Sequence, residues 1–162
     1  MLAAFREPYR AVHLSLPTDV LRAPAPGRTP KIDLGRMLDA RELTDEYALL
    51  RLTHELEAAR KVVFVVGEGA HEAIGWVLGL ALRLRALVVT TPHGKGLVSP
   101  YHPQFRGVFG FSGHTSALAA LADPDVDLVL SVGCSFGEWA TGSWDEHALL
   151  NDRLVCVDSD PE

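Results

Sequence analysis

Apolar runs rich in β-branched residues alternate with stretches of helical periodicity along most of the chain. Continuous apolar runs are typical of strands buried on both faces of a parallel sheet, and they lie at Lys61–Val66, Leu87–Thr90, Val126–Val132 and Arg153–Val157. Apolar residues at helical spacing predict helices over Thr44–Arg60, His71–Arg85 and Thr115–Leu121. This alternation predicts an α/β fold, a three-layer, Rossmann-like, doubly wound parallel sheet.

Local signals refine these helices. Asp45 and Glu46 place acids in the first turn of the first helix, where they favour its dipole. Thr115 is a predicted cap for the last helix. Gly75 and Gly79 are four residues apart and share one face of the middle helix, so we expect this face to approach the sheet closely.

Proline and composition divide the chain into three regions. Residues 1–21 contain one strand-like run, Ala11–Leu16, residues 22–30 form a proline-rich linker, and residues 31–162 form the main domain. The strand-like run has no predicted partner, and an unpaired apolar edge promotes pairing with another copy. We therefore expect self-association or a mobile N-terminal arm.

Composition excludes several function classes. The 162 residues are 48% hydrophobic and 22% charged, with a net charge of −6 and no basic block, which argues against binding to nucleic acid or anionic membranes. No apolar run approaches the roughly 20 residues needed to cross a bilayer, and no signal-peptide core is present. Cys134 and Cys156 match no metal or redox motif and are interpreted as small buried side chains. A cytoplasmic setting is expected.

Glycine-rich segments follow the predicted strands. Because ligands of open parallel sheets bind beyond the carboxyl ends of the strands, the segments expected to share one rim are Gly67–Ala70, Thr91–Gly96, Gly133–Glu138 and Asp158–Asp160. Clustered glycines indicate close backbone approach or positive φ, and the passage from Thr90 to Ala117 contains Gly94, Gly96, Gly107, Gly110 and Gly113.

Three features of this rim have two interpretations each. Gly67 and Gly69 lie between a strand and a helix, the context of a phosphate-binding turn, but a tight structural turn fits equally. Lys95 is either a phosphate contact or a solvated loop lysine. Asp158 could accept hydrogen bonds from ribose hydroxyls or cap a helix.

Histidines and acids add little more to the rim. His93 and His114 stand on the rim, where non-catalytic roles are favoured for both. An ordinary NAD site is disfavoured because Thr90 and Thr91 occupy the place of the usual ribose-binding acid.

The ordered set of segments resembles one enzyme family. Val12–Val20, Val66–Ala70, Thr90–Gly96, Gly107–His114, Asp127–Gly133 and Val157–Asp160 resemble, in order and spacing, segments of thiamine-diphosphate-dependent enzymes such as acetolactate synthase, pyruvate oxidase and benzoylformate decarboxylase. The resemblance implies the central domain of such an enzyme, preceded by the end of its N-terminal pyrimidine-binding domain.

The same resemblance implies what lies elsewhere. In this family the catalytic glutamate belongs to the N-terminal domain, and the motif for magnesium and diphosphate belongs to the C-terminal domain. We therefore expect a domain truncated at its C-terminus, either excised or from a truncated reading frame. It would be inactive alone, with no catalytic or metal-ligating residue, and its partners would be the missing domains and further copies of itself.

The resemblance also implies a cofactor site for FAD, ADP or neither. By family analogy Gly67 and Gly69 would allow close approach, Lys95 would contact the diphosphate, Gly110, Gly113 and His114 would form the flavin-side wall, and Asp158 would bind ribose. Ser135–Trp139 lacks the arginines that anchor a flavin diphosphate in this family. A structural spacer or oligomerisation domain without cofactor, and a free-standing NAD-binding domain, are the alternatives.

Overall fold

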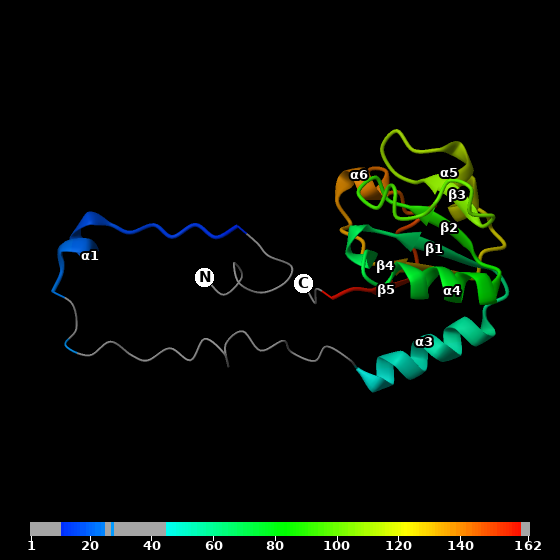
Figure 1. Ribbon diagram of the computed structural model, residues 1–162, viewed down its shortest axis with the longest axis horizontal. Coiled ribbons are helices and arrows are strands. Elements are labelled where there is room, and N and C mark those ends of the chain that lie inside the picture. Colours follow the sequence, from blue (N-terminus) through cyan, green and yellow to red (C-terminus); the bar gives the residue numbers. More distant parts are fainter. Residues whose placement is uncertain (1–10, 25–26, 28–44, 160–162) are drawn as a thin grey trace. The chain divides into compact units, whose positions relative to one another are not determined.

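The computed structural model describes residues 11–24, 27 and 45–159 (Figure 1). The chain divides into two units, Met1–Leu43 and Thr44–Glu162. Most of the predicted linker and the beginning of the predicted main domain, through residue 44, lie outside the described residues.

The described part of the first unit forms one short helix. Residues 11–24 are exposed, and α1 (Thr18–Arg22) begins after Pro17 as its N-cap. Asp19 in the first turn and Arg22 in the last turn both favour the helix dipole. The strand predicted over Ala11–Leu16 is wrong, because these residues form no regular secondary structure.

Five parallel strands form one sheet in the second unit, in the order β3-β2-β1-β4-β5. They are β1 (Val62–Val66), β2 (Leu87–Thr90), β3 (Phe105–Val108), β4 (Leu128–Val132) and β5 (Leu154–Val157). The chain runs outward from β1 through β2 to β3 and then crosses back to β4 and β5. The order therefore reverses between β1 and β4, the switch point at which doubly wound folds bind ligands.

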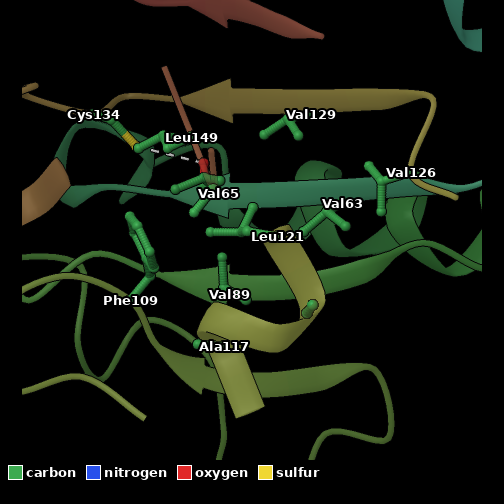
Figure 2. Close-up of a cluster of buried hydrophobic side chains, with 12 residues drawn as sticks. Val63, Val65, Val89, Phe109, Ala117, Leu121, Val126, Val129, Cys134 and Leu149 are labelled. Carbon is green, nitrogen blue, oxygen red and sulfur yellow. Dashed lines mark hydrogen bonds between the residues drawn. The ribbon is translucent and has the colours of Figure 1, made fainter. Parts of the chain in front are cut away.

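Helices cover both faces of this sheet, as the predicted α/β fold requires (Figure 1). α3 (Glu46–Ala58) and α4 (Ile74–Leu84) contribute to one core with Phe64. α5 (Thr115–Leu121) packs on the other core, where Leu121 approaches Val63 and Val65 of β1 (Figure 2). Every side chain of β1 is buried, and each is worth roughly 1.5–3 kcal/mol in transfer from water.

The predicted elements are present with shifted ends, and some elements were missed. Asp45 caps α3 by accepting hydrogen bonds from the amides of Tyr47 and Ala48. Thr115 does not cap α5, because its N-cap is His114. The sequence pattern did not predict the edge strand β3 or the single helical turn α6 (Glu138–Thr141). Both are short and interrupt the glycine-rich segments.

Helix α4 differs from its prediction in start and orientation. The chain first forms a 3-10 turn, η2 (Glu68–Ala70), so α4 begins only at Ile74. The expectation that Gly75 and Gly79 face the sheet is wrong, because both are exposed and a Cβ atom on either would meet nothing within 4 Å. Val77 and Ala81 face the sheet instead. No helix of the described part is long and apolar enough to span a bilayer.

Candidate functional site

The carboxyl ends of all five strands lie along one rim of the parallel sheet. The segments predicted to share this rim follow β1, β2, β4 and β5, and the missed strand β3 adds Phe109 and Gly110. The rim therefore contains every predicted site residue, but it does not gather them at one point.

At the switch point, the turn after β1 packs directly on the turn after β4. The Gly67 amide donates to Val132 O at 3.0 Å, and the Gly69 amide donates to Gly133 O at 2.9 Å. A Cβ atom on Gly67 would overlap the Gly133 carbonyl, and one on Gly133 would overlap the backbone of Gly69 and Ala70. These glycines thus allow the two loops to pack against each other. The Gly69 amide donates to Gly133 O and is therefore not free to bind a phosphate.

Two carboxylates, Glu68 and Asp158, lie close to these turns. The Ser135 hydroxyl donates to Glu68 Oε1 at 2.7 Å, a contact that sequence reasoning missed because the two residues are far apart along the chain. Glu68 and Asp158 both act on the buried thiol of Cys134. Two carboxylates, one following β1 and one following β5, therefore border this part of the rim.

The loop after β2 folds back over the end of β1. Thr91 donates its amide to Val66 O at 3.0 Å, and its hydroxyl accepts from the Gly94 amide at 3.1 Å. A Cβ atom on Gly94 would overlap Val66 O. This anchored turn presents the next residue, Lys95, at the surface beside Gly96, whose φ is 98°.

His114 joins the two glycine clusters. Its Nδ1 accepts from the Val108 amide at 3.0 Å, and its own amide donates to Val108 O at 2.7 Å. The imidazole lies 2.9 Å from where a Cβ atom of Gly107 would be. With Nδ1 committed as an acceptor, the neutral ring carries its proton on Nε2. This structural role agrees with the non-catalytic interpretation.

The cationic side of the rim contains a cavity of about 530 Å³. Lys95, Arg106 and His114 are among the residues that line it, together with Phe105 and Val108 of β3. Arg106 was not predicted, since β3 itself was missed. Its Nη1 donates to the carbonyls of Pro103 and Phe105.

His114 also lines a second cavity of about 200 Å³, whose wall includes Gly110, Gly113, Leu118 and Asp145. A Cβ atom on Gly110 would overlap the carbonyl of Trp139. The Trp139 ring stacks on Phe111 with centroids 5.2 Å apart. Both residues are more than half exposed, and neither lines either of the two cavities.

Cys134 is a core residue, as predicted (Figure 2). Burial raises the pKa of its thiol to about 12, and the thiol contacts Val65 O at 3.5 Å. It therefore remains protonated at neutral pH and is not a nucleophile. Cys156, in contrast, is exposed, because the carboxyl half of β5 is uncovered.

The predicted site residues consequently form three groups. Lys95 and His114 share the larger cavity, Gly110 and Gly113 join His114 at the smaller one, and Gly67 and Gly69 lie at the switch point. Asp158 follows β5, which lies three strand positions from β2. That separation is about 14 Å, so only an extended ligand could touch both ends.

Known proteins resemble this chain over most of its length. A probable 2-ketoarginine decarboxylase of Pseudomonas aeruginosa is 34% identical over 159 residues, 94% of this chain and 26% of the relative. A putative acetolactate synthase large subunit of Mycobacterium tuberculosis is 30% identical, with coverage of 95% and 29%. A pyruvate decarboxylase of Hanseniaspora uvarum is 29% identical, with coverage of 93% and 27%.

The chain spans between a quarter and a third of the length of these three relatives. Residues 49–162 match the family described as the central domain of thiamine pyrophosphate enzymes. The match covers more than half of the chain and includes all five strands, the switch point and both cavities. The chain belongs to the central-domain family of the thiamine pyrophosphate enzymes.

Proposed function

We propose that this chain is the central domain of a thiamine-diphosphate-dependent enzyme that acts on 2-oxo acids, in the manner of acetolactate synthase. We further propose that its rim binds the ADP part of FAD or of a related nucleotide. One observation carries the nucleotide proposal: Lys95, Arg106 and His114 all line one cavity along the edge strand β3 of a Rossmann-type sheet.

Charge along the rim sets the direction in which a nucleotide would bind. The diphosphate belongs beside Lys95, because Glu68 and Asp158 would repel it at the opposite side. Those carboxylates are instead suited to accept hydrogen bonds from ribose hydroxyls. Gly67 and Gly69 have no side chains that would block a ligand crossing the switch point. Gly110, Gly113 and His114 would form the wall of the site on the side of the smaller cavity.

ADP is favoured over FAD as the ligand of this chain. The segment Ser135–Trp139 contains no arginine and carries Glu138, so a flavin diphosphate would lack bidentate anchors there.

The glycines favour a second candidate function, a structural spacer without cofactor. Gly67, Gly94, Gly110 and Gly133 each lie where a Cβ atom would overlap the chain's own backbone. Their presence is therefore explained without any ligand. In a spacer, Lys95 would simply be a solvated loop residue.

Thiamine diphosphate and magnesium are assigned to other parts of the enzyme. Within residues 11–24, 27 and 45–159, no three His, Cys, Asp or Glu side chains gather as metal ligands do.

Calorimetric titration of the chain with ADP and with FAD tests the nucleotide site. We expect ADP to bind, and Lys95→Met to weaken the affinity at least about tenfold, because the charged contact to phosphate is lost. Arg51→Met is the matched control, since it removes a cation that is 67% exposed on α3. If neither ligand gives a heat signal, a displacement assay tests for binding that releases no heat. If that assay also detects no binding, the nucleotide proposal is wrong and the structural spacer is the function that remains.

A further inference from the structure

A single residue, His114, bonds to the outer edge of the sheet at the end of β3. This strand lies at the edge of the sheet and pairs only with β2, where the Phe109 amide donates to Thr90 O at 2.8 Å. The amide and carbonyl of Val108, one residue earlier, therefore point away from β2. His114 bonds to both groups: its Nδ1 accepts from the Val108 amide at 3.0 Å, and its own amide donates to Val108 O at 2.7 Å.

The Val108 amide depends on the imidazole ring more than the ring depends on the amide. Val108 is only 9% exposed, and a buried amide that lacks an acceptor destabilises the folded chain. His114 is exposed, so water is available to its ring in another orientation. Gly107, with a φ of 109°, leaves space for the ring, since a Cβ atom there would lie 2.9 Å from Nδ1.

The side chain at position 114 does not play the part that its place in the fold favours. His114 is the N-cap of α5, but its side chain forms no capping hydrogen bond. Asparagine is among the favoured N-cap residues, and its Oδ1 would offer Val108 an acceptor as many bonds from the backbone as Nδ1 is. Histidine differs from asparagine because it gains a proton between about pH 5 and pH 8. An imidazolium has two donors and no acceptor.

The charged groups around this ring line the two cavities that it shares. Lys95, from the loop after β2, and Arg106, from β3, line the larger cavity. Asp145, which follows α6, lines the smaller one. Helix α5 itself contains no charged residue. The two cations repel an imidazolium and the carboxylate attracts it.

We propose that His114 is a pH-sensitive latch on the loop between β3 and α5. The neutral ring accepts the Val108 amide and holds the end of β3. Protonation of Nδ1 places two N–H groups face to face, so the ring leaves Val108. It then turns away from the two cations and toward Asp145. Acid thereby frees the edge of β3 and changes the wall of both cavities, whether or not a nucleotide binds there.

Hydrogen exchange of the full chain, followed by nuclear magnetic resonance at about pH 7.5 and about pH 5, tests the latch. We expect the protection of the Val108 amide, relative to an unstructured chain at the same pH, to fall about fivefold in acid, as for the loss of one hydrogen bond. The Phe109 amide, whose acceptor is Thr90 O, is the internal control and should keep its protection. Equal protection of Val108 at the two pH values would overturn the proposal and leave His114 a purely structural role.

Substitutions at position 114 separate the proton from the hydrogen bond. His114→Asn keeps an acceptor that does not titrate, so Val108 should stay protected at both pH values. His114→Ala removes the acceptor, so protection should already be low at about pH 7.5. His71→Asn, at an exposed histidine that follows η2, is the control and should leave the pH response unchanged. A pH response that persists in His114→Asn would also overturn the proposal, because another group would then cause it.

Asp145→Asn tests the direction in which the ring turns. It removes the charge but keeps the Oδ1 that accepts from the amides of His147 and Ala148 at 2.9 Å. The loss of Val108 protection should therefore move to lower pH, because the imidazolium loses its carboxylate. Asp152→Asn makes the same charge change at an exposed residue that lines neither cavity, and should not move it. A loss at the same pH in both variants would contradict the turn toward Asp145.

Discussion

Individual glycines carry much of the geometry of the rim. Gly133 adopts a φ of 60° and lies against the backbone of Gly69 and Ala70. Gly94 lies against Val66 O in the same way. A residue in the left-handed region with no room for Cβ combines two separate costs for any side chain. These residues hold neighbouring strand ends together, whether or not a ligand binds above them.

Gly133→Ala should therefore destabilise the domain strongly. We expect the free energy of unfolding to fall by about 3 kcal/mol or more, because positive φ and backbone overlap both penalise alanine. Gly137→Ala is the control, since a Cβ atom there meets nothing within 4 Å, and its effect should stay within about 0.5 kcal/mol. Urea unfolding followed by circular dichroism measures both, and equal stabilities would contradict the assigned role.

At the scale of secondary-structure elements, Asp127 connects three of them, α3, β1 and β4. Asp127, just before β4, accepts hydrogen bonds from the amides of Arg60 and Lys61 at 2.8 and 2.9 Å, where the chain passes from α3 into β1. Its own amide donates to Lys61 O at 3.0 Å. These amide hydrogen bonds, assisted by the charge of Arg60, lower the pKa of the Asp127 carboxyl below its usual value of 3.8.

This junction should make stability depend on pH. A carboxyl whose pKa is lower in the folded state stabilises the fold above pH 3.8, and that contribution is lost as pH falls through the folded-state pKa. Asp127→Asn should lower Tm by about 3 °C at pH 7, and the difference from the unaltered chain should shrink at pH 3. Asp125→Asn makes the same charge change at an exposed neighbour. Thermal unfolding of the two variants and the unaltered chain at pH 7 and pH 3 measures these Tm differences. A larger Tm loss for Asp127→Asn at pH 3 than at pH 7 would contradict the prediction.

The elements that were predictable are those with long, uniform patterns. The valine runs of β1 and β2 bury every or nearly every side chain, so apolar continuity alone identified them. β3 was missed because Arg106 and Gly107 interrupt its four residues. Gly75 and Gly79 were assigned to the wrong face because spacing shows that they share a face, not which face the sheet covers.

The candidate site was predictable in its parts but not in its assembly. The positions of Lys95 and Asp158 after strands followed from the pattern of the fold. Their separation across the rim depends on strand order, which sequence periodicity does not contain. The place of Arg106 in the wall of the larger cavity and the contact of Ser135 with Glu68 both depend on tertiary structure. No local sequence pattern predicts either of them.

At the scale of the whole molecule, the chain corresponds in length to one part of its relatives. It spans 26% of one relative and 29% of another. The names of its relatives include both decarboxylases and synthases. Membership of the same domain family therefore does not specify a reaction for this chain.

We therefore expect the 162-residue chain to be inactive by itself. With thiamine diphosphate, magnesium and pyruvate supplied, pyruvate should not fall faster than in a protein-free mixture. A full-length relative acting on pyruvate is the positive control in the same coupled assay. Pyruvate consumption that follows the purified chain through a second chromatographic step would contradict the proposal.

The reversal of strand order also has a consequence for how the domain folds. β1 pairs with β2 after a connection that spans one helix, whereas Val62 pairs with Leu128 only after β2, β3 and α5 have intervened. Closing a longer loop costs more chain entropy before any contact repays it. We expect the β1–β2 half to form first and the seam at Gly67 and Gly133 to close last, so the slowest step of folding assembles the rim.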